Sequence, residues 1–331
     1  MDHRQLGTSS LHISPVILGA WAIGGWYWGG KNDRSSINSI HAALDHGINA
    51  IDTAPVYGQG HSETVVGKAL EGKRNQVVLM TKVGLRWDLQ EGAHFFDIED
   101  EHGAAQIFRN LRSKSIKQEV EESLKRLKTD YIDLLQCHWP DPSCEVEETM
   151  EALSELVTEG KVRAIGVSNF EVPLLKRSID ALSPLPLVSN QPRYSLLQRR
   201  LERSVLPFLK ENNIGCIVYS PLAQGLLTGT VSPERIFPED DGRCGDPAFS
   251  KEHRIAVLQA LEELNHIIKQ YSCTYAQLAA AWCINTPGIT GAIVGIRTIE
   301  QAKENAAAAQ LKLSTAELKT IETAFSHLTK L

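Results

Sequence analysis

The sequence has no excess of positive charge and no closely paired cysteines. Its 331 residues carry 34 lysines and arginines against 40 aspartates and glutamates, a formal net charge of −6. This balance argues against partners such as nucleic acid or an anionic membrane surface. The six cysteines include no C-x-x-C pair, and no histidine cluster lies near them at metal-ligand spacing. We therefore expect reduced thiols, no metal site and a cytoplasmic protein.

Apolar segments of the kind that enter membranes are also missing. The first ten residues, MDHRQLGTSS, contain no apolar core of a secretory signal. Residues 16–30 are uncharged, but this stretch of 15 residues contains five glycines and is too short and too interrupted to span a bilayer. We expect no membrane partner.

Three familiar site signatures are absent or incomplete. The stretch VILGAWAIGG does not fit the G-x-G-x-x-G that opens a doubly wound dinucleotide-binding sheet. GKALEGKR, residues 67–74, fits G-x-x-x-x-G-K but ends in arginine where a phosphate loop needs serine or threonine, and it begins in a predicted helix. The first strand lacks the H-x-H typical of metal-dependent barrel hydrolases. A doubly wound sheet is therefore the less favoured fold.

Short apolar runs alternate with amphipathic stretches along the chain, which is typical of strands buried on both faces with helices outside. The predicted strands end at Gly19, Asp52, Lys82, His138, Ser168, Gln191, Tyr219 and Gly295. The predicted helices cover residues 35–46, 62–70, 116–127, 146–159, 172–181, 201–212, 251–271 and 299–309. No linker divides them, so we predict an α/β protein, a single (β/α)8 TIM barrel over residues 1–331.

Additions to the barrel are predicted at both ends and in two loops. Residues 4–14 have a turn-like centre and are expected to form a β-hairpin, and Ser314 with Glu317 indicates a capped extra C-terminal helix. Two loops, within residues 86–114 and 226–250, lack clean periodicity and follow strands. We expect both to be irregular and to lie on the catalytic face of the barrel.

Four polar residues at or after strand ends would meet at that face: Asp52, Tyr57, Lys82 and His138. Taken singly, an aspartate there commonly caps a turn, and a histidine beside an apolar run is commonly a core residue. Together they form a proton-transfer set. A neighbouring Lys82 could stabilise the phenolate of Tyr57, and Asp52 could keep Lys82 charged. His138 could hold a substrate oxygen in line with the tyrosine hydroxyl.

The motifs GINAIDTAPVYG, MTKVG, QCHWPDP, VRAIGVSNF, NQPRYSLL and YSPLAQGLLTG occur in this order. With them the chain resembles the aldo-keto reductases, and within that family the bacterial and potassium-channel β-subunit-like branch. The eight residues between Ala54 and Glu63 depart from the mammalian aldose-reductase pattern. The resemblance implies reduction of an aldehyde or ketone, with hydride from a nicotinamide cofactor and a proton from Tyr57.

The resemblance also implies a cofactor site. Ser168, Asn169 and Gln191 would bind the nicotinamide carboxamide, and Tyr219 would stack on its ring. Arg297 would face a 2′-phosphate, which favours NADPH, with NADH possible but less favoured; alternatively, Arg297 is an exposed residue at a helix start. The full implied set is Gly19, Ala20, Trp21, Asp52, Ser168, Asn169, Gln191, Tyr219, Ser220, Leu222, Gln224, Gly225, Gly295, Arg297, Gln301, Glu304 and Asn305.

An aromatic, mostly apolar substrate cleft is expected beside the four polar residues, although some of its rings would be core packing. Such a cleft suits small aldehydes or ketones with hydrophobic substituents. Its predicted residues are Trp21, Trp26, Tyr57, Trp87 and Trp139, with Tyr27, Trp28, Phe95 and Phe96 as further aromatic candidates.

The sequence thus predicts an NADPH-dependent carbonyl reductase acting on a small molecule. The alternative, also suggested by the resemblance, is a cofactor-sensing regulatory subunit with slow turnover, and only this alternative calls for a protein partner.

Overall fold

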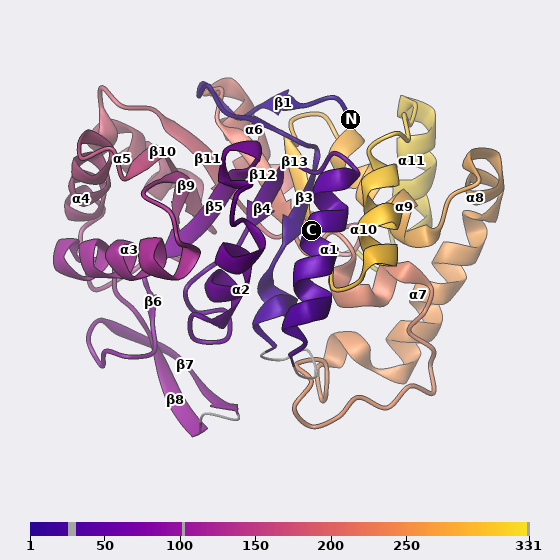
Figure 1. Cartoon of the computed structure of the whole chain (residues 1–331). Coiled ribbons are helices and arrows are strands. Elements are labelled where there is room, and N and C mark those ends of the chain that lie inside the picture. Colours follow the sequence, from indigo (N-terminus) through magenta and orange to yellow (C-terminus); the bar gives the residue numbers. More distant parts are fainter. Residues whose placement is uncertain (26–30, 101–102, 330–331) are drawn as a thin grey trace.

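The computed structural model describes residues 1–25, 31–100 and 103–329, and within them eight parallel strands close into a barrel (Figure 1). The strands are β3 (Val16–Gly19), β4 (Ala50–Asp52), β5 (Val78–Val83), β9 (Ile132–Cys137), β10 (Val162–Ser168), β11 (Leu187–Gln191), β12 (Gly215–Tyr219) and β13 (Gly291–Gly295). They pair in this order, with β13 closing on β3. The predicted (β/α)8 barrel is confirmed.

Helices surround this barrel. They are α1 (Asp33–Asp45), α2 (His61–Ala69), α3 (Ser113–Leu127), α4 (Val146–Thr158), α5 (Val172–Leu182), α6 (Val205–Glu211), α7 (Lys251–Glu263), α8 (Asn265–Tyr271), α9 (Tyr275–Asn285), α10 (Ile299–Ala308) and α11 (Thr315–Ala324). The helix predicted over residues 251–271 is two helices that meet at Leu264. The extra C-terminal helix is α11, with a capping box between Ser314 and Glu317 as predicted.

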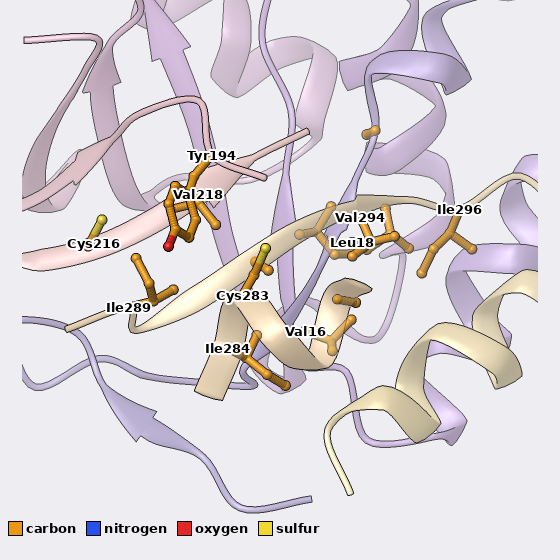
Figure 2. Close-up of a cluster of buried hydrophobic side chains, with 14 of the residues drawn as sticks. Val16, Leu18, Tyr194, Cys216, Val218, Cys283, Ile284, Ile289, Val294 and Ile296 are labelled. Carbon is orange, nitrogen blue, oxygen red and sulfur yellow. The ribbon is translucent and has the colours of Figure 1, made fainter. Parts of the chain in front are cut away.

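Helix α9 was not predicted, because it is apolar around most of its circumference and shows no amphipathic period. Figure 2 shows Cys283 and Ile284 of α9 among buried side chains of the barrel strands, including Val16 of β3 and Val218 of β12. The residues TYAQ at its start form a capping box between Thr274 and Gln277, which is a signal that sequence reading could have used. No helix in the described ranges, α9 included, combines the length and apolarity needed to cross a bilayer.

The N-terminal hairpin closes the end of the barrel where the strands begin. Its strands, β1 (Arg4–Gln5) and β2 (His12–Ile13), pair antiparallel. Leu6, Leu11 and Ile13 are buried against a layer that takes one side chain from each barrel strand. That layer consists of Ile17, Ala50, Met80, Leu134, Ala164, Val188, Ile217 and Ile293. The predicted N-terminal β-hairpin is confirmed.

The first long loop is not irregular, contrary to prediction. It forms a small antiparallel sheet of β6 (Leu85–Arg86), β8 (Gly103–Arg109) and β7 (Ala93–Asp100), which projects away from the barrel (Figure 1). The pairing register shifts between His94 and Phe96, so a bulge interrupts the two-residue alternation. This irregularity hides the strand in the sequence.

The second long loop, residues 226–250, is mostly irregular, as predicted. It leaves the barrel through a short 3-10 segment, η4 (Ala223–Thr228), and ends at η5 (Pro247–Phe249). Phe237 is buried within it and makes an edge-to-face contact with Phe249. The guanidinium groups of Arg235 and Arg243 lie 5.2 and 4.6 Å from the Phe237 ring centre, so this aromatic residue anchors the loop.

Candidate active site

The register of the barrel brings the predicted site residues to one level. Gly19 pairs with Asp52, and Ser168 pairs with Gln191. Lys82 pairs with Gln136, two residues before His138. Because all these strands run in parallel, their carboxyl ends form a single mouth, opposite the hairpin-closed end.

Asp52, Tyr57 and Lys82 form one hydrogen-bonded group. Lys82 Nζ lies 2.6 Å from Asp52 Oδ2, 3.1 Å from the Tyr57 hydroxyl oxygen and 3.0 Å from the carbonyl oxygen of Thr53. The three hydrogens of the ammonium group therefore each have an acceptor. The Lys82 and Asp52 side chains are almost completely buried.

Burial and charge set the proton positions in this group. Burial alone would lower the pKa of Lys82, but Asp52 and Tyr57 outweigh it, so the pKa of Lys82 is raised and the ammonium stays charged. Burial raises the pKa of Tyr57, and Asp52 adds to the effect, while Lys82 opposes it. The expected lowering by Lys82 is present but smaller than the effect of burial. Tyr57 consequently holds its proton and can act as an acid.

His138 follows β9 directly and its ring meets Tyr57 edge to face, with ring centres 5.7 Å apart. Its backbone N–H donates to the carbonyl of Val83 at 2.9 Å, which fixes the start of the loop. Burial, reinforced by the nearby charge of Lys82, places the pKa of His138 well below its usual value. The imidazole is therefore neutral near pH 7.

A second polar group lies on β10, β11 and β12. Ser168 Oγ donates to the backbone oxygen of Gln191 at 2.7 Å. The Asn169 amide donates to the Ser168 hydroxyl and to the carbonyl of His138, and its oxygen accepts from the Tyr219 hydroxyl at 3.0 Å. Burial raises the pKa of Tyr219 to about 12, which keeps this donor protonated. The group is thus rigidly connected before any ligand arrives.

A cavity of about 730 Å³ joins these groups to the turn before α10. The predicted residues that line it are Gly19, Trp21, Asp52, Tyr57, His138, Trp139, Ser168, Asn169, Gln191, Tyr219, Ser220, Leu222, Gln224, Gly225, Gly295, Arg297 and Gln301. Lys82 lies behind Tyr57 and Asp52. One continuous cavity therefore contains most of the predicted site.

Glu304 and Asn305, predicted at the adenine end, do not line the cavity. The Glu304 carboxylate accepts from the Thr274 hydroxyl at 2.6 Å, on the side of α9. Asn305 is buried and its amide nitrogen lies 3.4 Å from the carbonyl oxygen of Gly295. In this structure both side chains support the turn and helix around the cavity.

Some of the predicted aromatic and strand-end residues also lie outside the cavity lining. Ala20 is buried and its N–H donates to the carbonyl of Asp52, outside the cavity lining. Trp87 packs with the apolar cluster beneath the β7–β8 hairpin, not against the cavity. Trp26, with Tyr27 and Trp28, falls outside the described residues.

The bulge in β7 gives the cavity an aromatic wall. Both Phe95 and Phe96 line it, although consecutive strand residues normally point to opposite faces. The Phe95 ring lies 5.0 Å from that of Phe96 and 5.3 Å from that of Trp139. Trp21 also lines the cavity, with its ring centre 6.2 Å from that of Tyr57, so aromatic side chains form much of the lining near Tyr57.

Sequence reading missed several residues of this site. Arg193, Arg235 and Arg243 line the cavity with Arg297, but their loops carry no periodic signal or charge cluster. Gln136 donates to Asp52 Oδ1 at 3.2 Å from inside the barrel. It stands next to Cys137 and His138 in the QCHWPDP motif, and a polar residue within an otherwise apolar buried strand was the available signal. Within the described residues, no group of His, Cys, Asp and Glu side chains could hold a metal ion.

A buried carboxyl group lies just outside the strand that carries Lys82. Glu119 on α3 accepts the N–H of Gly84 at 2.7 Å through Oε2, and its Oε1 has no hydrogen-bond partner among the described residues. Burial, opposed by Arg86, raises the pKa of this carboxyl from 4.5 to about 8. Between these pH values the unfolded chain has lost a proton that the folded chain keeps, so stability falls as pH rises.

Glu119→Gln is therefore expected to stabilise the protein at neutral and alkaline pH. It keeps an acceptor for Gly84, and folding no longer has to take up a proton or bury a carboxylate. At 1.36 kcal/mol per pH unit above 4.5, the gain in free energy of unfolding is about 3 kcal/mol at pH 7 and close to zero near pH 4.5. Urea denaturation of both proteins at pH 5, 7 and 8 measures it. A variant less stable than the parent at pH 8 would show that Glu119 is ionised and paired with Arg86.

The chain is similar to known proteins over nearly its whole length. A model of the Aldo/keto reductase family matches residues 15–325. The aldo-keto reductase YhdN of Bacillus subtilis is 41% identical, over 98% of this chain and 93% of its own. The NADH-specific methylglyoxal reductase of Escherichia coli is 39% identical, over 96% of each chain.

A more distant relative and a solved structure extend the comparison. A probable voltage-gated potassium channel subunit beta of Arabidopsis thaliana is 31% identical, over 92% of this chain and 90% of its own. The structure of a glycerol dehydrogenase from Gluconobacter oxydans superposes with a TM-score of 0.88 at 36% identity, covering 100% of this chain and 97% of the other. The likeness therefore extends over the whole barrel.

Proposed function

This chain is a member of the aldo/keto reductase family, and we propose that it reduces aldehydes or ketones to alcohols with NADPH, with Tyr57 as the proton donor. The observation that carries the proposal is the position of Lys82 Nζ, within hydrogen-bond distance of both Asp52 and Tyr57. This contact lies beside a cavity that continues to Arg297. A phenol, an ammonium and a carboxylate in this order constitute a supported general acid.

The residues of the cavity fit a dinucleotide. Its charged lining in the described part of the chain consists of Arg193, Arg235, Arg243, Arg297 and one carboxylate, Asp52. Asp52 is paired with Lys82, and Arg243 is paired with Asp241, which leaves an excess of positive charge. A positively charged cavity in a chain of net charge −6 favours a ligand with phosphate groups. A bound reduced nicotinamide would supply the hydride for the carbonyl carbon.

Side chains of this protein would then bind the substrate oxygen and donate a proton to it. Neutral His138 and the Tyr57 hydroxyl lie on the same side of the cavity and can both bind the carbonyl oxygen of a substrate. Tyr57 gives its proton to that oxygen, and the charge of Lys82 stabilises the phenolate left behind. Asp52 keeps Lys82 ionised throughout.

The substrate end of the cavity is apolar apart from Tyr57 and His138. Trp21, Phe95, Phe96 and Trp139 would bind the substituent of the carbonyl compound. This lining supports small aldehydes or ketones with apolar or aromatic groups as substrates.

The test of this function is the loss of absorbance at 340 nm when the protein meets NADPH and 4-nitrobenzaldehyde. Steady consumption across a panel of aldehydes supports a reductase. Binding of NADPH without consumption of any aldehyde supports the second candidate, a cofactor-sensing regulatory subunit. The match to a potassium channel subunit beta favours that candidate; the intact group of Asp52, Tyr57 and Lys82 favours turnover.

The preference for NADPH over NADH rests on Arg297, in a chain similar to an NADH-specific enzyme. The backbone of Arg297 is fixed by two hydrogen bonds: its N–H donates to the Gln301 side chain at 2.8 Å, and its carbonyl accepts from Ser35 at 3.0 Å. A guanidinium held on this turn can bind a 2′-phosphate through two parallel hydrogen bonds.

Arg297→Ala is expected to raise the Kd of NADPH by about 10- to 100-fold, since a hydrogen bond to a charged group contributes about 1.5–3 kcal/mol. The Kd of NADH should change less than about twofold, as no 2′-phosphate is lost. Fluorescence titration of the unliganded protein measures both constants. Arg193→Ala, in the same cavity, is the control and should weaken both dinucleotides equally. An equal loss for both in Arg297→Ala would remove the basis for the NADPH preference.

A further inference from the structure

Gln136 is a buried polar side chain that has no role in the proton transfer described above. It lies on β9, beside Lys82 in the pairing of β5 with β9, and has no exposed surface. Its amide nitrogen donates to Asp52 Oδ1 at 3.2 Å, and its amide oxygen accepts from Gln191 Nε2 at 3.0 Å. Because the two ends of the amide face partners of opposite kind, its orientation is fixed.

A third contact turns this pair of hydrogen bonds into a ring. Gln191 Nε2 also donates to Asp52 Oδ1, at 2.8 Å. Side chains from β4, β9 and β11 are thereby joined, and the ring links the carboxylate that holds Lys82 to a residue that lines the cavity.

The ring determines what Gln191 can offer to a ligand. An amide nitrogen has two hydrogens, and both of those on Gln191 are already donated, one to Asp52 and one to Gln136. The group that is left is the amide oxygen, which can only accept. If the Gln191 amide were reversed, its oxygen would face the oxygens of both Asp52 and Gln136, a buried and repulsive arrangement.

We infer that Gln136 is a positioning residue that, together with Asp52, locks the Gln191 amide with its oxygen available to ligand, and so makes the site selective for a group that donates N–H. This inference rests on the proposed cofactor site. The matching group is a primary carboxamide, such as that of nicotinamide. A carboxylate in the same place has only acceptor oxygens, so it is repelled by the Gln191 oxygen.

The experiment compares two ligands on the protein without substrate. NADP+ carries the carboxamide, and nicotinic acid adenine dinucleotide phosphate carries a carboxylate in its place. In the parent protein the acid analogue should bind at least about tenfold more weakly, equivalent to about 1.4 kcal/mol. Gln136→Met is similar in volume and has no hydrogen-bonding groups. In this variant Gln191 loses one of the two acceptors that hold its NH2 group and only Asp52 still opposes reversal of the amide, so the ratio of the two Kd values should fall several-fold towards one.

Matched variants separate positioning from general loss of structure. Asn190→Leu removes another buried amide, one that donates to the carbonyl of Phe170 and lies outside the ring. It should lower stability and leave the ratio of Kd values unchanged. The double variant Gln136→Met with Gln191→Met should show a ratio of Kd values no smaller than that of Gln191→Met alone, because Gln191→Met has already broken the ring. An unchanged ratio in Gln136→Met, or additive effects in the double variant, would overturn the inference.

A measurement on the unmodified protein covers the case in which Gln136→Met does not fold. The side-chain NH2 of Gln191 should exchange slowly with solvent in NMR spectra of the unliganded protein, and should stay protected when NADP+ is added. Fast exchange of these hydrogens would show that the ring is not formed. Failure of the parent protein to bind either dinucleotide would instead contradict the proposed function, and the exchange measurement would still decide on the ring.

Discussion

Tyr57→Phe is expected to reduce the rate of carbonyl reduction by about 10²- to 10⁴-fold, the range over which a positioned general acid contributes. The substitution removes the proton donor and leaves the ring in place against Trp21 and His138. Lys82 keeps its bonds to Asp52 and to the carbonyl of Thr53, so the barrel should remain folded. Single-turnover oxidation of NADPH measures the rate, and fluorescence titration should give a Kd for NADPH close to that of the parent.

Tyr219→Phe is the matched control for this prediction. It removes a second tyrosine hydroxyl from the same cavity, one that donates to Asn169 and lies outside the proton-transfer group. Its effect on the reduction rate should be far smaller. Near-normal turnover by Tyr57→Phe would mean that another group supplies the proton.

Lys82→Met is expected to affect stability as well as activity. It leaves the buried carboxylate of Asp52 without its cation, and breaking a buried ion pair from one side typically costs about 3–5 kcal/mol in free energy of unfolding. Turnover should fall by about 10²-fold or more, because nothing then stabilises the phenolate of Tyr57. Urea denaturation and the absorbance assay at 340 nm measure the two effects.

The double variant Lys82→Met with Asp52→Asn distinguishes the two effects. Removing both charges should restore much of the lost stability, since the unpaired charge is the cause of the loss. Turnover should not return, because the ammonium is still missing. A double variant that recovers activity along with stability would show that Lys82 serves folding alone.

The strands of the barrel could be predicted because each is a short apolar run, and most of these runs end in a polar residue at the mouth. Closure of the barrel then places Lys82 Nζ 2.6 Å from Asp52 Oδ2, although 30 positions separate the two residues in the sequence. The motifs were specific enough to identify the family. The catalytic and binding roles of these residues, and the single domain over residues 1–331, stay predictions.

Other features depend on tertiary packing that sequence periodicity does not report. Helix α9 is enclosed on nearly all sides, so it carries no polar stripe to reveal its period. The bulge near Phe95 removes the alternation that would have indicated β7. The contacts of Gln136 depend on side chains from three strands, and a single glutamine in a buried run does not specify its partners.

The N-terminal hairpin has a kinetic consequence. With Leu6, Leu11 and Ile13 packed against the innermost layer of side chains, the described part of the barrel has one end sealed, and the reaction chamber has to fill and empty through the other. Under the proposed function, the ligand seated nearer the sealed end is therefore expected to bind first and to leave last.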